Sequence, residues 1–185
     1  LVSPVPGQVE LPPVQLSLRA GAVVVASRRF TRVQAEALHD PVARDAAWSA
    51  QLSADQGQGR VQWQPAAQAS DGGRFVARLD RLSMPPIEAA VAAPGAADAA
   101  TGRPPALDVE IADFVLDGQP LGRLELLAHA DTARLRAGAW ELERLALKLP
   151  GASLQCSGRW TPGATGTPAQ MALDFGLDLS DSGAL

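Results

Sequence analysis

Tyrosine is absent from this 185-residue chain, which also contains a single cysteine and only 4% aromatic residues. One cysteine, Cys156, cannot form an intramolecular disulfide, so the chain is not a disulfide-stabilised scaffold. The scarcity of aromatic residues argues against a stacking platform for sugars or single-stranded nucleic acid. The net charge is -4 and the 16 lysines and arginines are scattered, so the chain has no basic stripe. We predict no nucleic-acid partner.

Motifs of catalysis are missing as well. The chain has no G-x-S-x-G elbow, no phosphate-binding G-x-x-x-x-G-K loop and no H-E-x-x-H zinc motif. We interpret His39 and His129 as solvent-facing residues at the ends of related strands. Acidic residues such as Asp108 and Glu110 fall on solvent-facing strand positions, whereas Cys156 falls on an apolar one. We therefore predict no enzymatic activity, no metal site and no cofactor.

Long apolar runs are the third absence. The sequence, which begins Leu-Val-Ser-Pro, contains neither a stretch of about 18 apolar residues nor a charged-then-apolar signal segment. Because this start lacks Met, we interpret the chain as a segment of a longer protein. Its apolar content of 46% is nevertheless too high for disorder, and predicts a folded chain.

Apolar and polar residues alternate through residues 169–179, the clearest periodic segment of the sequence. Met171, Leu173, Phe175 and Leu177 share one phase, which is the two-residue period of a strand with one solvent-facing side. The same period runs through Leu124 and Leu126, and through residues 152–156 around Leu154, with short turns such as 117–118 and 150–151 between strands. Short connections imply antiparallel pairing. The sequence therefore predicts an all-β fold of antiparallel meander strands.

Several of these strands change their apolar phase midway. Leu107, Val109 and Ile111 stand at odd positions, but Phe114 stands at an even one. A β-bulge supplies the extra residue at such a switch and increases the local twist. We expect a strongly twisted, curled sheet with a groove-like shape.

The pattern repeats with an offset of 91 residues, so that Leu16 matches Leu107 and Val33 matches Leu124. We predict a first β-repeat unit at residues 1–84 and a second at 107–185. The Ala/Pro/Gly-rich segment 85–106 between them is interpreted as a linker that forms a loop or a short helix.

Several segments carry a resemblance to a known family. They are residues 106–114 (ALDVEIADF), 118–126 (GQPLGRLEL), 157–160 (SGRW) and 181–185 (DSGAL), together with Trp140. In these the chain resembles the YhdP family of AsmA-like proteins. The resemblance implies a protein of the Gram-negative envelope, anchored in the inner membrane, whose periplasmic β-groove conducts phospholipid acyl chains between inner and outer membrane.

An apolar strand face suits this expected function, because burying each methylene gains about 0.8 kcal/mol without any specific polar contact. The residues that we predict to line the groove are Leu124, Leu126, Leu154, Met171, Leu173, Phe175 and Leu177. Glu125, Asp174 and Asp178 are expected to face water. The alternative is a scaffolding repeat protein whose apolar face is sealed as an ordinary core. Unpaired sheet edges predict that the chain self-associates.

Overall fold

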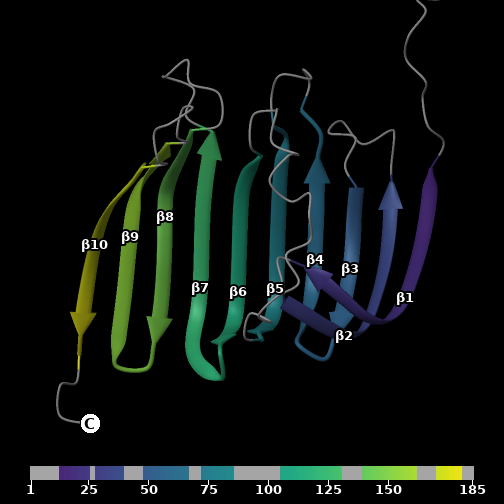
Figure 1. The fold of residues 1–185 in the computed structure, drawn as a ribbon, viewed down its shortest axis with the longest axis horizontal. Helices are drawn as coiled ribbons and strands as arrows, with labels where there is room; N and C mark the ends of the chain where they lie inside the picture. Colours follow the sequence, from purple (N-terminus) through teal and green to yellow (C-terminus); the bar gives the residue numbers. More distant parts are fainter. Residues whose placement is uncertain are drawn as a thin grey trace, which may run out of the picture.

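Ten strands form one continuous sheet in the computed structural model, which describes residues 13–25, 28–39, 48–66, 72–85, 105–130, 139–161 and 170–180 (Figure 1). Their spatial order is their order in the sequence. The strands are β1 (Val14–Val25), β2 (Arg28–His39), β3 (Trp48–Ala54), β4 (Gly57–Gln64), β5 (Arg74–Met84), β6 (Ala106–Leu116), β7 (Gln119–Ala130), β8 (Trp140–Leu149), β9 (Ala152–Thr161) and β10 (Gln170–Leu179). The predicted all-β class is confirmed.

Neighbouring strands are antiparallel from β1 to β5 and again from β6 to β10. The pairing of β5 with β6 is parallel, with Phe75 opposite Leu107 and Met84 opposite Leu116. Such a pair needs a crossover of a dozen or more residues, and the chain has room for one between Met84 and Ala106. The sequence pattern did not predict this parallel junction. The proposed linker lies almost wholly outside the described residues, and the division into two units stays a prediction.

The predicted changes of phase are confirmed as irregularities in the ladder. The register shifts between Ile111 and Phe114 and again between Leu142 and Leu145. In β7, Gly122 adopts a φ of 68°, the left-handed region that favours glycine. In the first group of strands Arg32 has a φ of 50° at the corresponding bend of β2. At the bend near Arg32 the ends of β1 and β2 turn across the sheet, as Figure 1 shows for the lower part of β1.

The hydrophobic core is thin because the sheet is a single layer. In the described part of the chain, the buried apolar residues are Ala77, Ile111, Phe114, Ala128, Ala139 and Ala146, and no large side chain is fully enclosed. Every residue of β10 is exposed. No helix of the described segments is long and apolar enough to cross a membrane. The sheet is therefore stabilised by the hydrogen bonds between its strands and by side-chain contacts on one face more than by an enclosed core.

We predict that Gly122→Ala lowers the free energy of unfolding by about 2 kcal/mol, because an alanine strains a positive φ and its Cβ would collide with the Lys148 carbonyl oxygen. Gly176→Ala is the matched control, since no atom lies within 4 Å of its added Cβ. Urea unfolding of both variants measures the difference. Equal stability of the two variants would contradict the role assigned to the bend.

Candidate functional site

One face of the sheet, here called the apolar face, carries rows of apolar side chains that run across all ten strands. In the first row each residue stands opposite the next in register. This row is Leu18, Ala35, Leu52, Gly59, Leu79, Ile111, Leu124, Leu147, Leu154 and Leu177. Nine inter-strand spacings of about 4.8 Å make the row about 43 Å long. It crosses the parallel junction without interruption.

A second row lies beside the first on the same face. Its members are Leu16, Ala37, Ala50, Val61, Ala77, Val109, Leu126, Leu145, Cys156 and Phe175. No charged residue interrupts either row. Cross-strand neighbours on one face lie close enough to contact each other. The two rows therefore form a continuous apolar floor perpendicular to the strands.

Apart from the bent end of the β1–β2 hairpin, no described strand packs against this floor, because the contacts between strands are concentrated between hydrogen-bonded neighbours. At the ends of the array large apolar side chains stand open, with Phe175 76% and Met171 65% exposed. Monomeric soluble proteins rarely leave such contiguous apolar surface uncovered, so a face of this kind marks a place of interaction.

The floor deepens into a hollow beneath the bent hairpin tip, which we define as residues 23–25 and 28–30. The cavity has a volume of about 360 Å³ and an almost wholly apolar lining. The side chains that line it are Leu18, Val23, Val25, Phe30, Val33, Ala35, Leu52, Ser53, Ala54, Gly57, Gln58, Leu79 and Leu82. The tip thus covers one part of the apolar face.

Polar contacts hold the tip in this position. Arg28 donates a hydrogen bond to the Pro85 carbonyl oxygen and forms an ion pair of 3.5 Å with Asp117. At the bend, the Thr31 hydroxyl donates to Asp55 at 2.6 Å. This hydrogen bond, together with the Arg32 guanidinium, holds the pKa of Asp55 below its usual value. These contacts pin the hairpin to the β3–β4 turn and to the end of β5.

Charged residues occupy the opposite, polar face and concentrate at the junction of β5 and β6. The Asp108 carboxylate forms ion pairs with the guanidinium groups of Arg74, at 2.5 Å, and Arg78, at 2.8 Å. Partial burial raises the pKa of Asp108, but hydrogen bonds from the two arginines outweigh burial and hold that pKa below its usual value. Further pairs join Arg78 to Glu110 and Arg81 to Asp113. In each pair that crosses the junction, β5 supplies the cation and β6 the anion.

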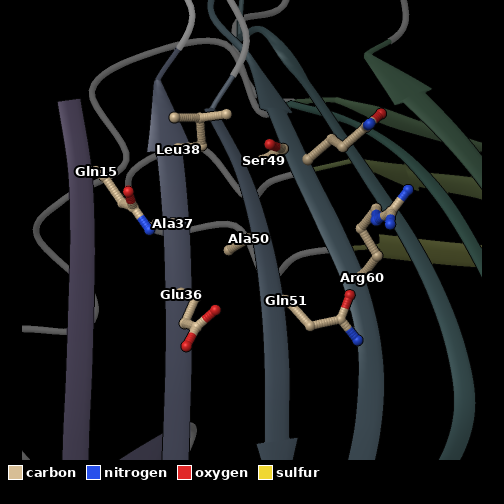
Figure 2. A pocket seen from close by; sticks show the side chains of 9 residues that line it. Gln15, Glu36, Ala37, Leu38, Ser49, Ala50, Gln51 and Arg60 are labelled. Carbon is tan, nitrogen blue, oxygen red and sulfur yellow. The ribbon is translucent and has the colours of Figure 1, made fainter. Parts of the chain in front are cut away.

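A second hollow, of about 350 Å³, lies over β1–β4 (Figure 2). Figure 2 shows Glu36, Gln51 and Arg60 side by side on three adjacent strands, with Gln15 nearby. The register confirms this order, with Gln51 between Glu36 and Arg60. The residues that line this hollow are mainly polar, in contrast to those of the apolar hollow beneath the hairpin tip.

The seven residues predicted to line the groove all lie on the apolar face. Leu124, Leu126 and Leu154 are half-buried in β7 and β9, and the register places Leu154 opposite Leu177. The four residues of β10 are exposed. One strand separates the β7 residues from Leu154. The structure thus places them on one surface, and their contact with lipid stays a prediction.

None of the residues that line the apolar hollow was predicted, because the predicted set fell entirely in the second half of the chain. The repeat carried the necessary signal: Val33, which lines the hollow, is the counterpart of Leu124. Extending each predicted residue by the offset of 91 would have found part of this lining. The bend of the hairpin over the face has no such signal in sequence periodicity.

The interpretation of both histidines as solvent-facing is wrong for His39. Its side chain is buried, and its ring centroid lies 4.8 Å from that of Trp48. His39 stands opposite Trp48, which stands opposite Trp63, so the imidazole belongs to an aromatic row at the end of the apolar face. His129 lies on the polar face near Glu141 and Glu143. The two histidines do not share an environment.

The described residues contain no group of histidine, cysteine, aspartate and glutamate side chains placed to hold a metal ion. What they do contain is an open, single-layer β-sheet with one continuous apolar face. This arrangement places the chain among proteins built on a single-layer β-sheet with an exposed apolar face. A family model described as YhdP protein matches residues 3–185, so the chain belongs to the YhdP family. No curated protein and no solved structure matches it.

We predict that Asp108→Asn lowers the free energy of unfolding by about 1 kcal/mol at neutral pH, because it removes two ion pairs at the junction. A carboxyl whose pKa is depressed in the folded state stabilises it above the unfolded pKa. This contribution is lost as the pH falls toward the folded pKa. The two proteins should therefore converge in stability below about pH 4.

Asp113→Asn is the control, because it removes a single exposed pair of 3.5 Å. Urea unfolding as a function of pH measures both variants. A difference for Asp108→Asn that persists undiminished at low pH would contradict the electrostatic explanation.

Proposed function

We propose that this chain forms part of the wall of a groove that carries phospholipid in the bacterial envelope. The uncovered apolar floor that crosses all ten strands carries the proposal. Acyl chains would lie on this floor and move along the rows. In this proposal the chain belongs to the periplasmic region of an inner-membrane-anchored protein and conducts lipid between the inner and the outer membrane. Membership of the YhdP family is compatible with that role.

The energetics of acyl-chain binding to the apolar floor favour passive movement along it. Covering about 12 methylenes gains about 10 kcal/mol before ordering costs, and the gain needs no specific polar contact. The rows offer similar apolar side chains at successive strands, so neighbouring positions bind an acyl chain with similar strength. A chain can then move along the floor without leaving a single deep site. Such a process requires binding and shelter from water, and no catalytic group.

The polar face complements this role. Its ion pairs and exposed charged residues suit contact with water, as Glu125 does through pairs with Arg123 and Lys148. A lipid on the apolar face would be separated from that water by the backbone of the sheet. One layer of strands thus divides an aqueous side from an apolar side, which is the minimum required of a groove wall.

Site-specific photocrosslinking in cells tests the proposal at adjacent residues of β10. A photoreactive residue at Leu173 lies on the apolar face, and one at Asp174 lies on the polar face. We expect mass spectrometry to detect attached phospholipid at Leu173, at a yield at least about tenfold above that at Asp174. The same comparison at Leu126 and Glu125 tests an interior strand.

The scaffolding alternative gives a different pattern in the same experiment. A sealed core would crosslink Leu173 and Leu126 to protein and would capture no lipid at either position. That result would overturn the proposed groove.

A charge placed on the floor should interrupt it. We predict that Leu154→Glu reduces phospholipid capture at Leu173 about tenfold, because it removes apolar contact worth about 1.5 to 3 kcal/mol and adds a charge beside the neighbouring strand. Gln155→Glu adds the same charge to the polar face, where it should change capture less than twofold. Circular dichroism checks that both variants fold. Equal loss in the two variants would contradict a role of the apolar face in binding.

A further inference from the structure

All four tryptophans of the chain lie on the apolar face at the same end of the sheet. They form two cross-strand pairs, one between β3 and β4 and one between β8 and β9. The first pair is flanked by a histidine of β2 and a phenylalanine of β5. We call this set the aromatic margin, and its members are His39, Trp48, Trp63, Phe75, Trp140 and Trp160. The strand ends that carry it point upward in Figure 1, away from the bent hairpin tip.

The distribution of aromatic residues separates the margin from the floor. Tryptophan combines a large apolar ring with a polar N–H, so it favours the boundary between hydrocarbon and water. Phenylalanine has no polar atom, and Phe30 lines the hollow while Phe175 stands in the second row of the floor. On the apolar face, aromatic residues with a polar ring atom are thus confined to one side.

Two polar atoms of the margin lack a hydrogen-bond partner. Nδ1 of His39 and Nε1 of Trp140 are buried and make no hydrogen bond in the described part of the structure. Buried polar atoms normally have a partner, and leaving one unpaired costs free energy. An ester carbonyl oxygen of a phospholipid is an acceptor suited to the indole N–H.

The distance across the floor matches one layer of acyl chains. Along β3, Ala54 lines the hollow six residues after Trp48, which is a rise of about 20 Å at about 3.4 Å per residue. One leaflet of a bilayer has a hydrocarbon depth of about 15 Å, half of the hydrocarbon core. An acyl chain that starts at the margin therefore reaches the hollow beneath the hairpin tip.

The hollow itself is a poor site for a headgroup. Its lining is almost wholly apolar, and the hairpin tip contributes apolar side chains such as Phe30 to it. The cations at the bend are already paired, Arg28 with Asp117 and Arg32 with Asp55. A phosphate in the hollow would lose its hydration without a compensating charge, which is costly.

We propose that a phospholipid lies across the strands of the apolar face, with its glycerol and phosphate at the aromatic margin and its acyl chains on the floor. Where the hairpin tip covers the floor, the chain ends lie in the hollow beneath it. This orientation rests on the proposed function, which it makes more specific. Movement along the rows then proceeds sideways, from one strand to the next, in steps of about 4.8 Å.

Photocrosslinking at two residues of β5 tests the orientation in the intact protein in cells. Phe75 belongs to the margin, and Leu79 lines the hollow four residues further along the same face. Mild alkaline hydrolysis of the adducts cleaves the ester bonds between glycerol and acyl chains, so mass spectrometry shows which part of the lipid was captured. We expect adducts that retain glycerophosphate to be about fivefold more frequent at Phe75 than at Leu79, where adducts retain a fatty acyl group.

A substitution in the margin tests the tryptophans directly. Trp63 stands opposite Phe75, so Trp63→Leu removes the amphipathic ring beside the photoreactive residue. We expect the fraction of Phe75 adducts that retain glycerophosphate to fall about threefold. Gln62→Leu is the matched control, because it changes the neighbouring residue on the polar face and should leave this fraction unchanged. Equal fractions in the two variants would contradict the role of the tryptophan.

The outcomes separate this inference from the proposed function. If Leu173 captures phospholipid but Phe75 and Leu79 yield the same mixture of adducts, the reverse assignment or no lipid, the orientation is overturned and the groove is not. If none of the three positions captures lipid, the groove itself is contradicted. Circular dichroism of the purified variants verifies that each remains folded.

Discussion

The structure depends on a single constraint, which is that a one-layer sheet satisfies its backbone through the ladders but leaves an entire face of apolar side chains without cover. In a sandwich or a barrel, a second layer or the opposite wall covers that face. Here the described strands contact mainly their hydrogen-bonded neighbours, and the buried apolar residues are few and mostly small. The bent hairpin tip covers one part, over the hollow that Phe30 and Leu79 help to line. The rest of the floor is exposed apolar surface, and the folded sheet becomes more stable when an apolar partner covers it. Folding stability and binding are therefore coupled.

The polar face meets a different demand, because it keeps the strands in order. A shift of one residue in register would exchange the two faces of a strand, and a sheet with one uncovered apolar face is sensitive to such a shift. The parallel junction is the place where no short turn fixes the register. It is also where Arg74, Arg78 and Arg81 of β5 meet the acidic residues of β6. Each exposed pair is weak by itself, but a set that matches in only one alignment specifies that alignment. The charges thus supply at this junction what hairpin turns supply elsewhere.

Sequence periodicity predicted those features that depend on which face a residue occupies. The alternation from Met171 to Leu177 determined strand, face and phase, and the switch between Ile111 and Phe114 appeared as a register shift, as expected. The direction of β6 relative to β5 was not predictable in this way, because periodicity is the same in parallel and antiparallel strands and the connection is long. The hollow was missed since it needs the hairpin to bend over the face, held by contacts as distant in sequence as Arg28 with Asp117. His39 was predicted to face solvent because histidine counts as a polar residue in a periodic pattern. In the structure its ring packs on Trp48 in an aromatic row.

The direction of the apolar rows explains why this architecture can be lengthened without being redesigned. The rows run perpendicular to the strands, so the floor grows by about 4.8 Å with each added strand while strand length stays constant. A barrel cannot do this, because added strands widen it instead of extending it. In an open array each new strand needs only apolar residues on one phase, polar residues on the other, and a register that keeps the two apart. The row from Leu18 to Leu177 satisfies these conditions even where Gly59 replaces a large side chain and where β5 meets β6 in parallel. A surface that tolerates these local differences is better suited to form a long path than to form a single selective pocket.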